Sequence, residues 1–308
     1  MFRYAFYNYN YNLLYHMELK IYKSLNQCCK LWNEFSPNKK LFDVWGFRQC
    51  FYDRDDNQPY FIAGRENGKT LGIIPLWYVK STNQYVYFGG WFPERNSFFL
   101  KEKTKLPQFL EQCPENTFIE AIDQTEGKYY NFLEDEYTYY LDLSKYDNDF
   151  EKYFSSFDKK KQKNFKGELK KIPKYKVFHN RLRDFNRLVE LSIKHFGDNS
   201  IYNDKALRNG ILKMVKLAYE KDILQMISLE INGKVEAVDV GITYGNWYHV
   251  VAGASNNQEI NNLGKLITIS SIKNAITKKY KFVDFLASSG YWKTHWKFDK
   301  EILLKFLN

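Results

Sequence analysis

The sequence predicts an α/β fold of the α+β type, with two tandem domains that each contain a mixed, mostly antiparallel sheet flanked by helices. Apolar runs surround Asn67-Gly68 in the first half and Asn232-Gly233 in the second half. Each dipeptide predicts a β-hairpin, because both central residues of such a turn need positive φ. In each half the third strand of this group runs into glycine, at Gly89-Gly90 and at Gly253. This repeated order indicates two copies of one supersecondary plan.

The length of 308 residues and a hydrophobic content of 44% suffice for two domains. We expect domains at 17–150 and 151–308, the second beginning with a basic amphipathic helix. Residues 1–16 alternate Tyr and Asn without a hydrophobic stripe. We interpret them as a disordered tail or as the result of a misplaced start codon, in preference to a binding arm.

Periodicity and turn residues predict the individual elements in both halves. In the first half we expect a strand at 19–22, helices within 26–35 and 42–52, and strands within 59–66, 69–79 and 84–90. In the second half we expect a strand at 176–180, helices at 184–197 and 205–221, strands within 223–231, 234–243 and 247–254, a helix at 262–279, a strand at 282–288, a short helix at 290–296 and a last strand at 301–307. The helix at 184–197 is predicted to end at Gly197 and to present one apolar face, made of Phe185, Leu188, Val189, Ser192 and Phe196.

A basic amphipathic helix is predicted between the halves. Ser155 and Asp158 have capping-box spacing, and Pro173 is expected to end the helix. One face is apolar (Phe154, Phe157, Phe165, Leu169, Ile172) and the other carries Lys159, Lys160, Lys161, Lys163, Lys166, Lys170 and Lys171. The lysines are either a solvated surface or a positive wall that attracts a phosphorylated or nucleic-acid ligand.

Composition narrows the functional classes. The formal net charge of +10 is compatible with anionic partners, and no apolar run is long enough to cross a membrane. The four cysteines have no CxxC spacing and the five histidines form no HxxxH or HExxH motif, so we expect reduced thiols and no metal. We therefore expect a soluble, cytoplasmic protein without stable membrane insertion.

The order of elements in the second half resembles that of the GNAT acyltransferases. The segments "EINGKVEAVDVGITYGNWYHVVAGASN" and "FVDFLASSGYWKTHWKF", together with "LWNEFSPNKKLFDVWGFRQCFY" in the first half, resemble the CelD-like, BioF-type acetyltransferase branch. That branch is related to the Fem-type peptidoglycan aminoacyltransferases, which also pair two GNAT-like domains.

The resemblance implies that an acyl-CoA, such as acetyl-CoA, is the co-substrate. Its pantetheine arm would lie beside the fourth strand, and its pyrophosphate at the start of the following helix. The implied cofactor-binding residues are Val250, Val251, Ala252, Gly253, Asn262, Gly264 and Lys265. The loop departs from the family pattern, because Glu259 puts a negative charge near the expected phosphate and Asn262 stands where a glycine is usual. A plain strand-to-helix loop is the alternative.

Three residues are candidates for catalysis. His249 lies on the strand where the fold often keeps a base, and Asp239 interrupts an apolar strand, where a carboxylate must be paired or have a raised pKa. Each could instead be purely structural. Tyr291 matches the tyrosine that in many GNAT enzymes protonates the leaving thiolate, with aromatic packing as the alternative. Lys293 and Asp284 match recurrent positions of the CelD-like branch and are candidates for substrate binding.

We therefore expect an N-acyltransferase that moves an acyl group from acyl-CoA or acyl-carrier protein to an amine. The acceptor would be a small molecule such as an amino sugar or amino acid, or a cell-envelope precursor. One alternative is a Fem-like aminoacyltransferase that uses tRNA, which the lysine-rich helix would suit. The other is a catalytically inactive GNAT-fold binding module.

Overall fold

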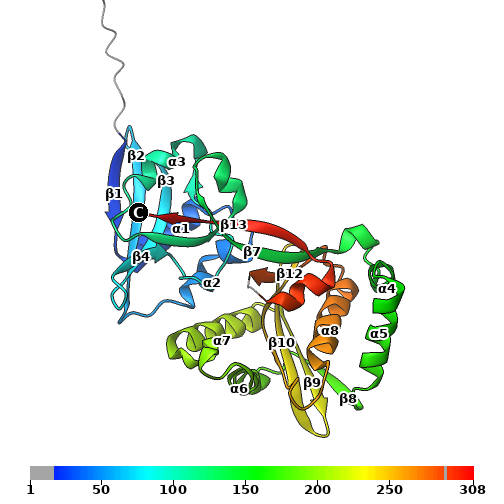
Figure 1. Cartoon of the computed structure of the whole chain (residues 1–308). Coiled ribbons are helices and arrows are strands. Elements are labelled where there is room, and N and C mark those ends of the chain that lie inside the picture. The colour runs from blue at the N-terminus through cyan, green and yellow to red at the C-terminus, as the bar shows by residue number, and fades with distance from the viewer. Residues whose placement is uncertain (1–16, 288–289) are drawn as a thin grey trace, which may run out of the picture.

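The computed structural model describes residues 17–287 and 290–308. The expectations for residues 1–16 fall outside this range. Two sheets organise the chain: a five-stranded antiparallel sheet of order β1-β2-β3-β4, with β5 beside β3, and an eight-stranded sheet of order β6-β13-β7-β12-β11-β10-β9-β8 (Figure 1). Their strands are β1 (Glu18–Tyr22), β2 (Asn57–Glu66), β3 (Lys69–Val79), β4 (Gln84–Tyr87), β5 (Phe99–Leu100), β6 (Phe118–Ile122), β7 (Leu133–Asp142), β8 (Tyr175–His179), β9 (Leu224–Ile231), β10 (Lys234–Tyr244), β11 (Trp247–Ser255), β12 (Phe282–Ala287) and β13 (Asp299–Leu307).

Both predicted hairpin turns are confirmed. Asn67 and Gly68 have φ of 50° and 74°, and Asn232 and Gly233 have 51° and 80°. A Cβ added at Gly68 or Gly233 would meet nothing within 4 Å, so these glycines are required for their positive φ and not for lack of space. The resulting hairpins, β2-β3 and β9-β10, are antiparallel.

Helices cover both faces of the second-half sheet. In Figure 1, α6 (Asp184–Phe196) and α7 (Lys205–Glu220) lie on one face, and α8 (Leu263–Thr277) lies on the other with α5 (Lys159–Lys170) outside it. The buried residues divide in the same way: one cluster joins α6 and α7 to β10, and another joins α8 to the aromatic residues around α5. The remaining helices are α1 (Leu25–Phe35), α2 (Trp45–Gln49), α3 (Leu106–Leu110) and α4 (Phe150–Ser155), with 3-10 turns that include η6 (Ile201–Asn203) and η7 (Tyr291–Trp296).

Two local predictions are wrong. The basic segment forms two helices, α4 and α5, and Asp158 is the N-cap of α5, accepting from the Lys161 N–H at 2.8 Å. Asp158 does not form a capping box with Ser155, because the chain bends between these two residues. Its short carboxylate instead caps the start of α5. Phe196, predicted on the buried face of α6, is largely exposed. Gly197, at φ 55°, ends the helix as predicted.

The two halves share strands. β6 and β7 precede residue 150, yet both pair with β13 from the end of the chain. In Figure 1, β13 (red) runs from the second half into the first. An isolated parallel bridge, Tyr85 to Thr117, connects β4 to β6 and thereby links the two sheets. The domain boundary at residue 150 stays a prediction, and the strand exchange shows that the halves fold against each other.

Gly241 provides a stability test of the site-bearing sheet. A Cβ there would lie 2.5 Å from the ring of the buried Tyr248. We expect Gly241→Ala to lower the free energy of unfolding by about 1–3 kcal/mol through overpacking. Gly167→Ala is the matched control, because nothing lies within 4 Å of its added Cβ on α5, and it should be neutral or stabilising by up to about 1 kcal/mol. Urea unfolding measures both, and equal effects would contradict the packing argument.

Candidate active site

The strands β11 and β12 separate after a short parallel pairing. They pair at Trp247 with Phe282, at Tyr248 with Val283 and at His249 with Asp284. Immediately beyond, β11 carries a bulge at Val251, because Val240 of β10 faces Ala252 while the next residue faces Val250. A bulge bends and twists its strand. The bend turns β11 away from β12 and opens a gap in the middle of the sheet.

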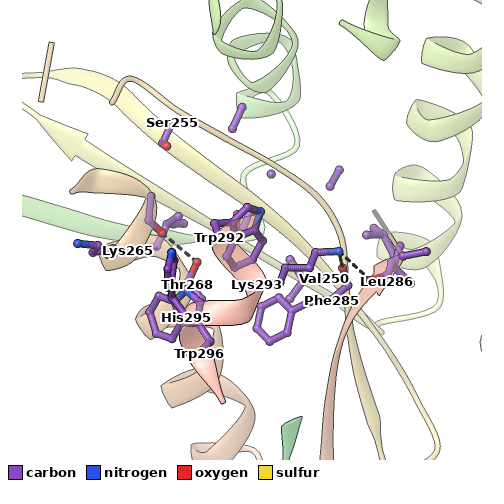
Figure 2. Close-up of a pocket in the computed structure, with 18 of the residues that line it drawn as sticks. Val250, Ser255, Lys265, Thr268, Phe285, Leu286, Trp292, Lys293, His295 and Trp296 are labelled. Carbon is purple, nitrogen blue, oxygen red and sulfur yellow. Dashed lines mark hydrogen bonds between the residues drawn. The ribbon is translucent and has the colours of Figure 1, made fainter. Parts of the chain in front are cut away.

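A cavity of about 1060 Å³ occupies this gap. Its walls include the ends of β11 and β12, the first turns of α8, and η7 (Figure 2). One side of α5 and the end of α6 also line it. Four acidic residues from the first half also line it: Glu94, Glu120, Asp135 and Glu136. This volume is slightly above the range of about 300–1,000 Å³ that is typical of small-molecule sites. The gap is therefore large enough for two reactants.

Past Asp284, β12 has β7 on one side only, and two ionic side chains bind polar groups of its last backbone segment. Lys293 donates to the carbonyl oxygens of Phe285 at 2.8 Å and Leu286 at 2.7 Å, as Figure 2 shows. Glu94 accepts the Ala287 N–H with both carboxylate oxygens, at 2.6 and 2.8 Å. Leu286 itself has a φ of 59°, which is uncommon outside glycine and asparagine. We call Lys293 and Glu94 together the clamp. The clamp holds a strained backbone segment in place at the cavity wall.

Burial shifts both charged groups of this clamp toward neutrality. Desolvation lowers the pKa of Lys293, although Glu94 and Asp284 oppose the shift. Desolvation and the charge on Asp284 raise the pKa of Glu94, and the Ala287 N–H opposes this. The charge of each group opposes the shift in the pKa of the other. Within the described part of the chain, hydrogen bonds account for two of the three ammonium protons of Lys293, and the group lines the cavity.

His249 and Asp284 form a buried pair behind the cavity. His249 Nδ1 lies 3.0 Å from Asp284 Oδ2, and the other carboxylate oxygen accepts the Leu286 N–H at 2.9 Å. Burial acts to raise the pKa of Asp284, but the hydrogen bond from His249 and the charge of Arg95 outweigh it, and the pKa lies below its usual value. Because Asp284 is a carboxylate at neutral pH, His249 Nδ1 is the donor. The pair braces the point at which the strands separate.

Asp239 lies in the floor of the cavity. It accepts from Ser271 Oγ of α8 at 2.9 Å, and burial raises its pKa to about 7. Gly253 faces it across the β10-β11 pairing, and a Cβ at Gly253 would come within 2.3 Å of Asp239 Oδ1. Glycine is therefore required at this position of β11. A carboxylate with a pKa near neutrality is suited to accept and release a proton at the pH of the cell.

The start of α8 forms another wall of the cavity. Asn262 adopts φ 67° as its N-cap, the left-handed conformation that a glycine would supply. The Gly264 N–H donates to Asn257 Oδ1 at 2.8 Å, so one of the first free donors of this helix is already satisfied. Lys265 pairs with Glu168 of α5 at 2.6 Å. Glu259 pairs with Lys194 and is not among the lining residues, which keeps its charge away from the helix start.

Among residues 17–287 and 290–308, no group of three or more His, Cys, Asp or Glu side chains is arranged to hold a metal ion. Of the helices in that part of the chain, none combines the length and apolar character needed to cross a bilayer.

Comparisons with known proteins identify this arrangement. Residues 159–295, which include α5, β11, α8 and η7, match the family described as "Acetyltransferase (GNAT) domain". The chain contains a GNAT acetyltransferase domain. The strands β11 and β12, which border the gap, both lie within the matched residues. A comparison with curated proteins found no match.

Solved structures show that the fold extends over more than nine tenths of the chain. FemX is 12% identical with a TM-score of 0.60, over 93% of this chain and 96% of its own. A tandem GNAT protein from the clavulanic acid biosynthesis pathway is 6% identical with a TM-score of 0.53, over 94% and 97%. A GNAT-family acetyltransferase from Colwellia psychrerythraea is 9% identical with a TM-score of 0.51, over 94% and 98%. The chain therefore has two GNAT-like domains, and the second indicates an acyltransferase.

The structure gathers most of the predicted site residues of the GNAT domain in one place. Asp239, Lys293 and all seven predicted cofactor-binding residues line the cavity: Val250, Val251, Ala252, Gly253, Asn262, Gly264 and Lys265. His249 and Asp284 lie behind it as a pair. Tyr291 is 76% exposed and not among the lining residues. The roles assigned to all of these residues stay predictions.

Sequence reasoning missed Glu94 and Arg95, which reach the GNAT domain from the first half. Arg95 lies 3.8 Å from Asp284 and also pairs with Glu301. The available signal was two adjacent charged residues in "FGGWFPERNSFF", a glycine-rich and otherwise apolar stretch after a strand. Such charges are expected to be exposed unless another part of the chain supplies partners.

The raised pKa of Asp239 predicts how stability depends on pH. The ordinary value is 3.8 and the folded value is about 7, so the folded state holds its proton more tightly than the unfolded state. The stability from this group is complete below about pH 4 and is lost as pH rises to about 7. We expect the free energy of unfolding of Asp239→Asn to fall less than that of the wild type over this interval. Urea unfolding at pH 5, 6, 7 and 8 measures this, and parallel curves would contradict it.

Proposed function

We propose that the chain is an N-acyltransferase that moves an acyl group from acyl-CoA to an amine within the β11-β12 cavity. The observation that carries this proposal is the open gap, with Lys293 in its wall and Asp239 in its floor. A pantetheine arm is narrow and has amide groups, so it can pair with the free edge of β11 as a strand would. Gly253 and Gly264 have no side chains that could narrow this path, and a Cβ at either position would collide with Asp239 or Asn257 respectively.

The charges around the cavity support separate binding sides for the acyl donor and the acceptor amine. Lys161 and Lys265 line the side formed by α5 and α8, where the N–H groups at the start of α8 add positive potential. This side suits the anionic phosphates of the donor. The first-half wall carries Glu120 and Glu136, whose pKa values are raised by burial and by the charge of Asp135. That wall favours a cationic group, such as the ammonium form of an acceptor.

The proposal gives each group a task. Asp239 accepts a proton from the ammonium group, which frees the nitrogen lone pair for attack on the thioester carbonyl. Lys293 stabilises the negative charge that develops on the carbonyl oxygen, because a buried cation acts strongly where water is excluded. The C–N bond forms, the C–S bond breaks, and the thiolate leaves. Tyr291 stays the predicted proton donor to that thiolate, although its ring is exposed in this structure.

One observation favours a second candidate, a Fem-like transfer of an aminoacyl group from tRNA. Asn257 already satisfies the Gly264 N–H, and a donor that does not need this N–H would leave that bond intact. The lysines of α5 would attract an RNA backbone. Salt-dependent binding of aminoacyl-tRNA without any effect of acyl-CoA would select this candidate. Binding of neither donor would select the inactive binding module.

Donor binding is the first test. We expect millimolar acetyl-CoA to raise the melting temperature of the wild type, because a ligand of the folded state stabilises it. Gly264→Asp should abolish the shift, since even a Cβ there would lie 2.8 Å from Asn257 and the added carboxylate would repel phosphate. Gly167→Asp adds the same charge at a position with open space and should retain the shift. An unchanged wild-type melting curve would reject an acyl-CoA donor.

Lys293 gives the test of chemistry. We expect Lys293→Met to lower kcat by about 10²- to 10³-fold while leaving the KM for the donor within a few-fold, as for loss of one oxyanion-stabilising donor. Lys300→Met, an exposed lysine of β13, is the control and should keep wild-type rates. Thiol release from acetyl-CoA in the presence of an amine panel measures both. A Lys293→Met enzyme with normal kcat would assign Lys293 to structure alone.

A further inference from the structure

Four large apolar side chains that line the cavity are exposed: Trp292 of η7, which is 43% exposed, and three that lie outside η7. Trp91 is 55% exposed, Phe196 is 53% exposed and Ile201 is 38% exposed, and all three line the cavity. We call these three residues the apolar rim. Large apolar side chains left in contact with water at the edge of a concave site are typical of a surface that a ligand covers.

The chain holds the apolar rim in a fixed position. Trp91 and Ile201 are each followed by a buried aromatic residue, Phe92 and Tyr202, which belong to the same core cluster. Trp91 makes an edge contact with Phe92, with ring centroids 6.0 Å apart. Phe196 is the last residue of α6, before the chain reverses at Gly197. The rim residues are therefore outward-facing members of anchored segments, and they need little reordering to bind a ligand.

The apolar rim and the basic residues lie on opposite sides of the sheet. Phe196 and Ile201 belong to the α6-α7 layer, and the cluster beneath them joins Phe92 to that layer. Lys161 and Lys265 belong to α5 and α8, the layer on the other face (Figure 1). The gap between β11 and β12 connects the two sides, since all of these residues line one cavity. Two reactants can thus approach the same point from opposite faces.

We infer that the acceptor amine carries an aromatic or branched aliphatic group, which binds against the apolar rim while its nitrogen reaches the gap beside Lys293. This inference rests on the proposed function and names its acceptor class. If the donor phosphates occupy the α5-α8 side, the acceptor must enter from the α6-α7 side, where it meets Trp91 and Phe196. The bonds that form and break are those already described, and the apolar rim contributes binding and orientation only.

Direct binding tests the rim without requiring turnover. Saturation-transfer NMR and titration use the full chain with phenethylamine, isoamylamine and ethanolamine, three primary amines that differ in apolar bulk. We expect the first two to bind and ethanolamine to bind at least ten-fold more weakly. The double variant Trp91→Ala, Phe196→Ala should lose at least ten-fold in phenethylamine affinity, because each side chain removes a large apolar contact. Tyr219→Ala is the control, since Tyr219 on α7 is 51% exposed and does not line the cavity.

Activity measurements separate this inference from the proposed function. With acetyl-CoA, we expect kcat/KM for phenethylamine to exceed that for ethanolamine at least ten-fold in the wild type and in Tyr219→Ala, and the preference to shrink in the double variant. If acetyl-CoA stabilises the protein but all three amines bind equally or not at all, the inference about the apolar rim fails and the proposed function stands. If phenethylamine binds at the rim and acetyl-CoA has no effect, the acyl-CoA function fails and the rim assignment stands.

A third outcome would also overturn the inference. If octanoyl-CoA binds at least ten-fold more tightly than acetyl-CoA, and the double variant loses that difference, the apolar rim holds the acyl chain of the donor instead of the acceptor. The melting temperatures of the double variant and of Tyr219→Ala without ligand show whether either substitution disturbs folding. Circular dichroism of each variant confirms that binding is compared between folded proteins.

Discussion

The separation of β11 and β12 leaves part of one edge of β12 without a partner strand, and the organisation of the site depends on this. Buried backbone N–H and C=O groups need hydrogen-bond partners wherever a sheet opens. Here Lys293 takes two carbonyl groups of β12, and Glu94 takes the next N–H. Asp284, paired with His249, holds the N–H of Leu286 between them. The same groups that satisfy the opened strand thereby place charge at the cavity wall.

The two GNAT-like repeats differ in what fills the corresponding gap. In the first half, the segment at Asn96 pairs with β6, through Asn96 N–H to the Ala121 carbonyl and Asp123 N–H to the Asn96 carbonyl. In the second half the place beside β12 stays open. Residues just before Asn96 instead extend into the second half, where Trp91 and Glu94 line the cavity. The segment around residues 91–96 thus has two roles. Asn96 pairs with β6 in the first half, and Trp91 and Glu94 form part of the cavity wall in the second half.

Local signals explain which parts of the fold were predictable. The Asn-Gly turns, Gly197 at the end of α6 and Asn262 at the start of α8 each depend on φ values that few residues adopt, so their positions could be predicted from sequence. The exposure of Phe196 could not, because helical periodicity shows which residues share a face but not that the face extends into a cavity. Glu94 was equally hidden, since its partner Ala287 lies 193 positions away. Contacts between distant segments leave no periodic trace.

The pairing of β13 between β6 and β7 has a consequence for folding kinetics. These two strands are synthesised long before β13, and they have no direct ladder with each other. Until β13 arrives, each exposes an unpaired edge that can associate with other chains. Loop closure over such a distance is slow compared with local hairpin formation. Completion of the eight-stranded sheet is therefore expected to be a late, rate-limiting event, and nascent or partly refolded chains should be most prone to aggregate before it occurs.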